Sequence, residues 1–324
     1  MPEVSRHATL AEMPALNLPR LRRLLAVRGL TPASEITESA GGRTEEACVR
    51  LARIVEGERL ASLDVGPAEC WGEPLAFLDG IQRSTLVAYA GASPIIVAEV
   101  AAAVRERRGL ALATVVEERR VLAVGRPEAL AAAGPALEGL VGLALPQDEP
   151  PHPVRELHQA GRAVDRARGA LELAAAARFR SRSDGWLIVD GALSESPTWA
   201  QDPRIVGIAK SHATLPFEGE DLERYLRLPA GHRSSVFAPV TRSVAPVLAW
   251  ALRLWPWEGR DLLHGLVRVE VAPVNGTSAV ADRISRCLLA ERAPISTPDP
   301  RWDRLLYGIH SVEQYLRARA LVPA

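Results

Sequence analysis

Two short stretches decide the fold: AFLDGIQRS at residues 76–84 and DGWLIVDGALSESP at residues 184–197. In each, an apolar segment of strand length runs into the pair Asp-Gly, so each predicts a buried strand that ends on an acid, Asp79 or Asp190. Acids at the ends of adjacent strands lie at the edge of a sheet, where loops leave room for a ligand. Because two carboxylates repel each other there unless a proton or a cation lies between them, the pair predicts a cation site.

A third acid stands in the segment before the second of these strands. Residues 154–179 are rich in Ala, Leu, Glu and Arg, and predict a long helix that leads into the strand of Asp190. Glu172 lies there among alanines, on a stretch predicted to be buried, and a buried carboxylate is costly unless something pairs with it. Mg²⁺ and Mn²⁺ take oxygen ligands and leave positions for water and a substrate phosphate. Asp79, Glu172 and Asp190 therefore predict a divalent-metal site.

The rest of the chain predicts an α/β fold, a mixed sheet flanked by helices. The strand of Asp79 begins a meander that continues through residues 83–93, 94–107 and 109–125. After Asp190, strand-like segments at 204–212, 245–256 and 262–273 alternate with helical segments at 219–228, 277–292 and 305–321. Apolar residues at helical spacing through residues 43–63 predict an N-terminal helical region over residues 1–70, followed by one large domain over residues 71–324.

Composition limits the partners and the compartment. Acidic and basic residues balance at 39 each, so no overall positive field draws the chain to nucleic acid or to a membrane, and local basic patches must bind any polyanion. The three cysteines lack metal-ligand spacing and indicate reduced thiols. No apolar run reaches the roughly 18 residues that a membrane span needs. We expect a soluble, cytoplasmic protein.

The acids follow an order along the chain that resembles the ribonuclease H-like nucleases. In that fold the chain order is an Asp on a first strand, a meander, a Glu on a helix and an Asp on the next strand. The three acids converge on two metal ions, which hold the attacking and leaving oxygens of a phosphodiester. Within that superfamily, the chain resembles the NurA family of DNA-end-processing nucleases, which work with the hexameric HerA-type ATPase. The resemblance spans about residues 70–320 and is carried by FLDGIQRS (77–84), Glu172, IVDGAL (188–193), VGIAKSH (206–212) and RLLYGIHSVEQYL (304–316).

The resemblance implies a metal-dependent deoxyribonuclease. Asp79, Glu172 and Asp190 are then the ligands of two Mn²⁺ or Mg²⁺ ions, and the substrate is DNA at ends or in single strands, in repair or in defence against phage. The resemblance also implies a homodimer docked on a HerA-type ATPase, and the neutral net charge agrees with a protein that does not grip a duplex unaided.

The C-terminal motif departs from the family pattern. Tyr307 matches the family's tyrosine, but Gly308 follows it in place of proline. His310 is the only histidine nearby and lies closer to the tyrosine than in the family. Ile81 stands where serine is usual, which leaves the ligand Asp79 in place. Tyr307 and His310 are carried over as catalytic candidates on this resemblance.

Lys210 is the only lysine among the 39 basic residues, all the others being arginine. A lone lysine in an arginine-rich chain indicates a position that needs a compact point charge instead of a planar fork. It lies in VGIAKSH, on a strand expected beside that of Asp190. We therefore expect Lys210 in the active site, in contact with the scissile phosphate or its neighbour.

A basic run stands just before the strand of Asp190. Arg178, Arg180 and Arg182 are typical of a solvated helix end, and their position also makes them candidates for contacts with DNA phosphates. The tryptophans at 250, 255 and 257 are more typical of core packing than of base stacking.

Two other classes of function remain open. A catalytically silent relative would keep the fold and bind DNA or a protein partner, although all three acids are present. A carboxylate-pair hydrolase acting on sugars would need two facing acids and no metal, but it would not explain three acids in this order. Dependence of activity or thermal stability on Mn²⁺ distinguishes these classes.

Overall fold

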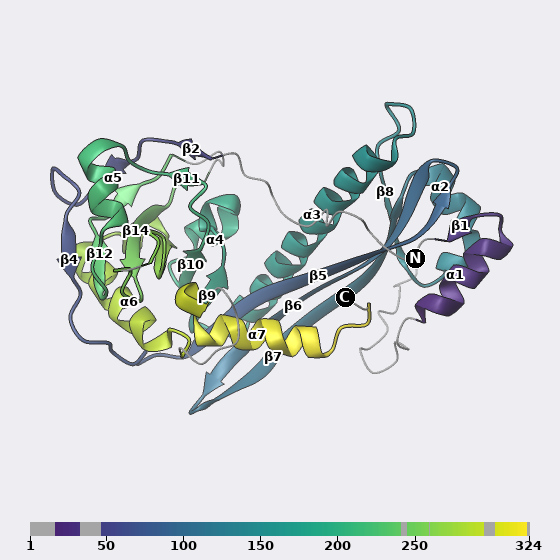
Figure 1. The fold of residues 1–324 in the computed structure, drawn as a ribbon. Helices are drawn as coiled ribbons and strands as arrows, with labels where there is room; N and C mark the ends of the chain where they lie inside the picture. The colour runs from purple at the N-terminus through teal and green to yellow at the C-terminus, as the bar shows by residue number, and fades with distance from the viewer. Residues whose placement is uncertain (1–16, 33–46, 241–244, 259, 295–301, 323–324) are drawn as a thin grey trace.

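The structure, a computed structural model, describes residues 17–32, 47–240, 245–258, 260–294 and 302–322. Within these residues the chain forms a thirteen-stranded sheet with helices on both faces, and a separate two-stranded sheet (Figure 1). The strands of the large sheet pair in both parallel and antiparallel directions. The prediction of an α/β fold with a mixed sheet flanked by helices is confirmed.

Three long antiparallel strands form the meander: β5 (Leu75–Ala90), β6 (Ser93–Arg108) and β7 (Ala111–Gly125). The strand of Asp79 and the segment 83–93, predicted as two strands, are one continuous strand, β5. Their turns contain Gly91 and Gly109, whose φ angles of 59° and 63° lie in the region that favours glycine. The strands extend past the rest of the sheet to an end that is covered by α1 (Leu18–Val27) and α2 (Pro127–Ala133) (Figure 1). The meander therefore runs from the middle of the molecule to one end of it (Figure 1).

A helix of 28 residues, α3 (Pro153–Arg180), follows the meander and leads into β9 (Trp186–Asp190). The strand β9 lies between β5 and β10 (Ile205–Ala209), parallel to both. Beyond β10, the strands β15 (Leu266–Val271) and β14 (Leu248–Arg253) continue the sheet in antiparallel directions. The central order β7-β6-β5-β9-β10, with α3 between the meander and β9, is the ribonuclease H-like arrangement that the sequence predicted.

The remaining described elements are mostly short. The helices are α4 (Pro197–Gln201), α5 (Gly219–Leu226), α6 (Ser278–Glu291) and α7 (Tyr307–Ala318), with 3₁₀ turns at Gly134–Leu137, Leu193–Glu195, Pro273–Asn275 and Trp302–Arg304. The strands are β1 (Thr31–Pro32), β2 (Cys48–Val49), β3 (Arg53–Ile54), β4 (Ser62–Asp64), β8 (Val141–Ala144), β11 (Thr214–Leu215), β12 (His232–Ser234) and β13 (Phe237–Ala238). The strands and helices predicted after Asp190 are all found.

The two faces of the sheet are covered by different helices. Successive side chains of a strand point to opposite faces, so neighbours along β5 and β9 enter different cores. Leu78 and Val189 pack in one core with side chains of α3. Phe77 and Ile188 pack in another core with side chains of α6 and α7. Odd-numbered residues near Phe77 on β5 therefore face α7, and even-numbered ones face α3.

The prediction of a helical region over residues 1–70 is wrong for residues 48–64. These residues form β2, β3 and β4, and in the first 70 residues α1 is the only helix within the described part of the chain. The strand β3 pairs with β13, and β4 pairs with β12, so this segment joins the large sheet. Gly57 interrupts the helical pattern with a φ of 80°, and the N–H groups of Val55 and Glu56 just before it donate to the carbonyl of Val236 instead of to a helix. The boundary proposed at residue 70 stays a prediction.

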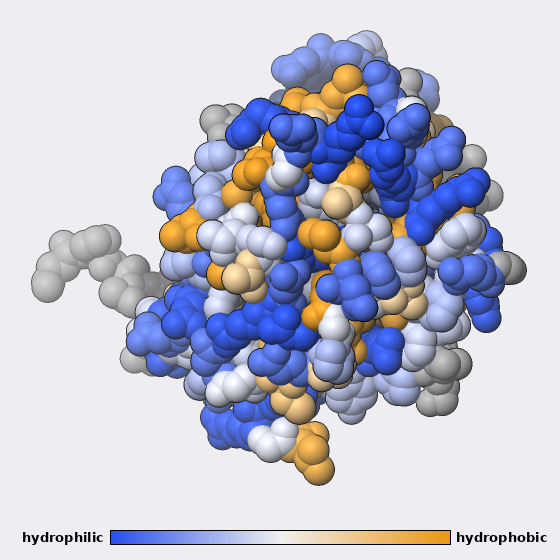
Figure 2. Space-filling view, turned by 90° about the vertical axis from the view of Figure 1, so that its left-hand side faces the viewer, coloured by the Kyte–Doolittle hydropathy of each residue, from blue (hydrophilic) through white to orange (hydrophobic). Residues whose placement is uncertain are grey.

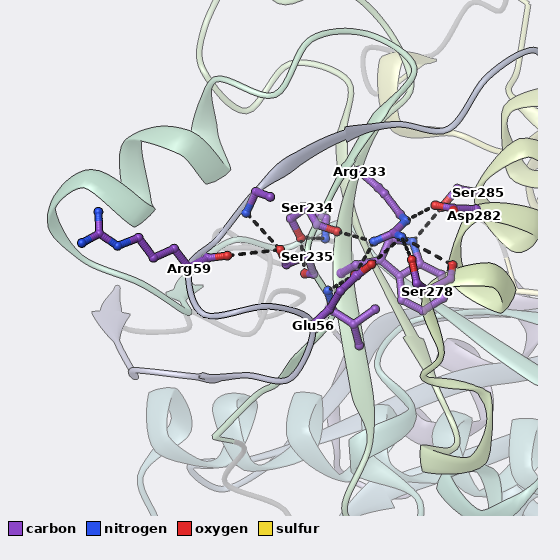
Figure 3. Close-up of polar contacts among 12 residues, drawn as sticks. Glu56, Arg59, Arg233, Ser234, Ser235, Ser278, Asp282 and Ser285 are labelled. Carbon is purple, nitrogen blue, oxygen red and sulfur yellow. Dashed lines mark hydrogen bonds and ion pairs between the residues drawn. The ribbon is translucent and has the colours of Figure 1, made fainter.

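A buried arginine holds this N-terminal segment on the sheet (Figure 3). The fully buried Arg233 of β12 donates from Nη1 and Nη2 to the carboxylate of Glu56, at 2.6 and 2.9 Å, and from Nε to Asp282 of α6 at 2.5 Å. Its Nη2 also donates to Ser278 Oγ at 3.0 Å. Because two carboxylates and a hydroxyl bind the guanidinium, its burial is tolerated. These bonds connect the N-terminal segment at Glu56 with β12 and with α6.

Side chains on the outer surface of this part of the molecule are mainly hydrophilic, with hydrophobic ones scattered between them (Figure 2). Among the described residues, no helix combines the length and the apolar character that a membrane span requires. Cys48, Cys70 and Cys287 all lie in the described ranges, and none of the three forms a disulfide.

Candidate active site

Asp79 and Asp190 lie next to each other on parallel strands. The register of β5 and β9 pairs Leu78 with Val189, so the next residues of both strands are neighbours across the ladder. Both carboxylates point to the face of the sheet that α7 covers, because they alternate with Leu78 and Val189 of the other core. Asp79 is only 8% exposed, whereas the side chain of Asp190 is 28% exposed.

Asp79 does not end its strand, contrary to the prediction from the Asp-Gly pair. It lies inside the 16 residues of β5, and Gly80 continues the ladder opposite Ala102 of β6. The glycine is needed for space and not for a turn: an added Cβ at Gly80 would overlap the carboxylate of Glu172. Asp190, in contrast, is the last residue of β9, as predicted.

Lys210 lies on the same face and pairs with Asp190. Its Nζ is 2.9 Å from Asp190 Oδ1 and 3.0 Å from Oδ2. The register of β9 and β10 places Asp190 opposite Ile208, and Lys210 follows on the same side two residues later. The only lysine of the chain therefore lies beside the acids of the site, and its side chain is 15% exposed. Contact with a phosphate stays a prediction.

Glu172 approaches the sheet from the opposite face. It projects from α3 against the backbone of Gly80, directly beside Asp79 in the chain. Arg168, one helical turn earlier, binds its carboxylate through Nη1, and also donates to Asp165 at 2.9 Å and to Gln82 of β5 at 3.2 Å. The three acids thus meet at one point of β5, two from one face of the sheet and one from the other.

The raised pKa values of two acids in the site reflect an excess of negative charge. Burial raises the pKa of Asp79 well above its usual range, and the charges of Asp190, Glu172 and Glu313 raise it further, while Lys210 opposes them. Burial also raises the pKa of Glu172 to about 7, although the bond to Arg168 lowers it. Lys210 and Arg168 therefore only partly neutralise the carboxylates around Asp79.

This donor set fits a hard divalent cation. Carboxylate oxygens are the ligands that Mg²⁺ and Mn²⁺ prefer, and a cation between Asp79 and Asp190 would relieve the repulsion that raises the pKa of Asp79. In the conformation described, Lys210 and Arg168 hold two of the carboxylates. Within the described ranges, no three His, Cys, Asp or Glu side chains are grouped as ligands of one ion. The residues predicted as ligands are near one another, and ion binding stays a prediction.

The C-terminal candidates lie on α7. Tyr307 is the first residue of this helix and is 48% exposed. His310 is half-buried, and its Nδ1 is buried without a hydrogen-bond partner in the part of the chain that the structure describes. Gly308, which replaces the family's proline, packs against the ring of Phe77, where an added Cβ would overlap it. Both candidates therefore lie on the helix that covers Asp79 and Asp190, and their catalytic roles are not tested.

The three arginines predicted to contact DNA are not beside the acids. They lie at the end of α3 and in the turn before β9, whereas Asp190 ends β9, about 13 Å further along the strand. Arg180 is used structurally: it donates to Asp202 at 2.8 Å and to the carbonyls of Ser183 and Gly185 at 2.7 and 2.8 Å. Arg178 pairs with Glu118 of β7 at 2.7 Å. Arg182 is exposed. The sequence predicted only that these residues stand just before the strand, and their contact with DNA phosphates stays a prediction.

Two tryptophans illustrate the packing role expected for this residue type. Trp250 is fully buried and donates from Nε1 to Ser285 Oγ at 2.9 Å. Trp255 contacts Trp302 edge to face at 5.6 Å and lies under the guanidinium of Arg292 at 4.4 Å. Packing is thus confirmed for Trp250, while Trp255 is partly accessible.

Sequence reasoning missed three residues near the acids. Arg168 precedes Glu172 by four residues, a spacing at which side chains on a helix meet, so this partner was available from the sequence. Gln82 and Glu313 carried no such signal, because the contacts that bring them to the site join segments far apart in the chain.

Solved structures that are similar to this chain include the following three. The NurA nuclease from Sulfolobus solfataricus matches with a TM-score of 0.49 and 12% identity, covering 77% of this chain and 80% of its own. Human ENDOV matches with a TM-score of 0.35 and 14% identity over 93% and 97% of the two chains. The catalytic domain of human Endonuclease V matches with a TM-score of 0.32 and 14% identity, covering 93% of each chain. No protein-family model matches the chain, and no curated protein matches it in sequence. At these identities the residues of the neighbours are not transferred to this chain.

Proposed function

We propose that the chain is a metal-dependent nuclease that hydrolyses phosphodiester bonds of DNA, at ends or in single strands. The observation that carries this proposal is the placement of Asp79 and Asp190 side by side on parallel strands, with Lys210 bound to Asp190. Acids with raised pKa values at a shared position are typical of functional sites, because a stable fold does not require them.

Each side chain of the site has its own role in this proposal. Asp79 and Asp190 would hold the cations from the α7 face, and Glu172 would add its carboxylate from the α3 face, where Gly80 leaves room for it. Two divalent ions, Mn²⁺ or Mg²⁺, would activate water and stabilise the leaving oxyanion. With a cation bound to Asp190, the ammonium of Lys210 would be free to bind a phosphate oxygen and would stabilise charge that develops there. Arg168 orients Glu172 from the same helix.

The assembly that we propose comes from the resemblance to the NurA family. It is a homodimer docked on a HerA-type ATPase, in the cytoplasm, with a role in DNA repair or defence against phage. The balance of 39 acidic and 39 basic residues supports a partner that delivers the DNA, because the chain has no overall positive field of its own. Light scattering of the purified chain, with and without a cognate translocase, tests this assembly; a monomer at micromolar concentration that does not associate contradicts it.

The nuclease proposal is tested with Asp79→Asn and Asp190→Asn. Each variant should lose Mn²⁺-dependent cleavage of single-stranded and end-labelled DNA, because each loses one ligand charge. EDTA should abolish cleavage by the unchanged protein. Mn²⁺ should raise the melting temperature of the unchanged protein but not of the variants, since a ligand that binds only the folded state stabilises it.

Circular dichroism of both variants in EDTA provides the control for folding. Full cleavage by both variants would remove the hypothesis. A chain that binds DNA but cleaves none under any divalent ion would instead support the catalytically silent alternative.

A further inference from the structure

We propose that Trp255, Trp302, Arg260 and Arg292 form a binding site for single-stranded DNA, in which an unpaired base stacks on an indole ring and the arginines contact phosphates. We call these four residues the tryptophan platform. The inference rests on the proposed nuclease function and deepens it, because it assigns unpaired DNA as the substrate that the protein binds.

The tryptophan platform joins two segments that are far apart in the chain. Trp255 follows β14, and Trp302 begins the 3₁₀ turn that precedes α7. Their ring centroids lie 5.6 Å apart with the planes inclined at 70°, so the two rings form a corner and not a stack. The guanidinium of Arg292 lies 4.4 Å from the centroid of Trp255, whereas that of Arg260 lies 5.9 Å from the centroid of Trp302. Because about 6 Å is the outer limit of a cation–π contact, the ring of Trp302 is covered only loosely.

Accessibility separates these two rings from a tryptophan that only packs. Trp250, on the neighbouring strand β14, has no exposed surface. Trp255 and Trp302 are partly exposed, and both arginines of the platform are exposed. Every base has a flat π-face, so accessible aromatic rings with cations beside them suit unpaired bases of any sequence. In a duplex those faces are covered by the neighbouring bases of the stack.

The strands place the tryptophan platform at the same end of the sheet as Asp190. The strand β14 runs in the direction of β9 and β10, because β15 is antiparallel to both β10 and β14 (Figure 1). One row across these four strands consists of Asp190, Ile208, Val269 and Trp250. Trp255 comes five residues after Trp250, toward the end of the sheet at which β9 finishes. Three strand spacings and the rise of five residues separate it from Asp190, a distance on the order of 20 Å.

The tryptophan platform also lies on the face of the sheet to which Asp190 and Lys210 point. Trp255 packs against the core that α6 and α7 cover, and this core contains Ile188 and Ile208. Each isoleucine stands two residues before Asp190 or Lys210, so these side chains share that face. A single strand that approaches the acids from this end of the sheet therefore passes the platform a few nucleotides before it reaches them.

The acids of this region limit its positive charge. Glu258 and Asp261 are exposed in the same loop as Arg260. Asp303, in contrast, is buried and accepts from the backbone N–H of Gly265 at 2.7 Å. Since two exposed acids offset the two exposed arginines of the platform, we expect stacking to supply most of the binding and the platform to select unpaired bases.

The test compares Trp302→Leu, which removes the aromatic face, with Trp302→Phe, which keeps one. Trp71→Leu is the matched control: Trp71 is also half-buried and meets Trp186 edge to face at 5.5 Å, but it precedes β5 and so lies at the other end of the sheet. Fluorescence anisotropy measures the affinity of the full chain for labelled single-stranded oligothymidylate in EDTA, where no metal-dependent cleavage takes place. We expect Trp302→Leu to weaken binding by about fivefold or more, and Trp302→Phe and Trp71→Leu to change it by less than about twofold.

A second measurement uses the unchanged protein and does not depend on how the variants fold. Stacking of a base on an indole ring quenches its fluorescence, so unlabelled oligothymidylate should quench part of the tryptophan emission. The absence of quenching overturns the inference. So do unchanged affinity in Trp302→Leu, an equal loss of affinity in Trp71→Leu, and an equal loss for a duplex of the same length.

Asp190→Asn separates this inference from the function on which it rests, because the binding assay needs no metal. If Asp190→Asn loses cleavage while Trp302→Leu keeps full affinity for the single strand, the nuclease proposal stands and the platform is refuted. If binding of the single strand depends on Trp302 but no divalent ion supports cleavage, the platform stands and the nuclease proposal fails.

Discussion

The ammonium of Lys210 lies 2.9 Å from Asp190 Oδ1, so the one lysine of the chain pairs with an acid of the candidate site. Its side chain is largely enclosed, and a guanidinium at the same place would be larger and planar. The position therefore suits a compact charge that can pass from a carboxylate to a phosphate oxygen.

From this contact we expect Lys210→Ala to lower kcat by about 100-fold, the scale observed when one group that stabilises developing charge is removed. Lys210→Arg should not restore normal turnover, because the guanidinium does not fit the same space. Single-turnover cleavage of a labelled oligonucleotide measures both effects. Normal turnover in Lys210→Arg would refute the compact-charge argument, and full activity in Lys210→Ala would place Lys210 outside the site.

Gly80 should tolerate no side chain. A Cβ at this position overlaps the carboxylate of Glu172, so Gly80→Ala should displace Glu172, reduce cleavage strongly and lower the free energy of unfolding by about 1–3 kcal/mol. Gly142→Ala on β8 is the matched control, because a Cβ there meets nothing within 4 Å. Denaturant melts and cleavage assays on both variants check this, and equal behaviour of the two would contradict the packing that we describe.

Glu172 should make stability in EDTA fall as the pH rises. Burial raises the pKa of Glu172 from 4.5 to about 7. The folded state then holds this proton more tightly than the unfolded state, so the stabilisation is full below pH 4.5 and is lost as the pH rises through about 7. Glu172→Gln, which does not ionise, should therefore melt increasingly higher than the unchanged protein from pH 5 to 8.

The exposed Glu138→Gln provides the control for that experiment, since its carboxyl lies on the surface. A melting difference between Glu172→Gln and the unchanged protein that does not depend on pH would argue against a strained carboxylate at this position.

Glu56 should show the opposite dependence on pH. Its pKa is lowered from 4.5 to about 2, because bonds from Arg233, Ser278 and the amide of Val236 outweigh the effect of burial. A lowered pKa stabilises the fold above pH 4.5, and this stabilisation is lost as the pH falls toward about 2. The unchanged protein should therefore lose more stability on acidification than Glu56→Gln, which lacks the titrating group. Glu58→Gln, at an exposed neighbour, should behave like the unchanged protein in chemical melts at pH 5, 4 and 3.

Much of the fold follows from local patterns. The meander, the helix α3 and the strands that carry Asp79, Asp190 and Lys210 were predicted because apolar runs and Gly-containing turns specify their own conformation. The segment at residues 48–64 was misread as helical because its pattern is short and its stability comes from partners elsewhere, above all the contact of Glu56 with Arg233. Local sequence does not encode such a distant partner.

The sequence by itself determined which acids and which lysine the candidate site contains, since these residues stand out in composition and in order along the chain. Only the tertiary structure decided how they meet. It placed Asp79 inside a long strand, packed Glu172 against Gly80 on the opposite face of the sheet, and used Arg180 at the end of α3 to hold the turn before β9. The physical reason is that facing and register depend on how strands and helices pack, and residues far apart in the chain set that packing.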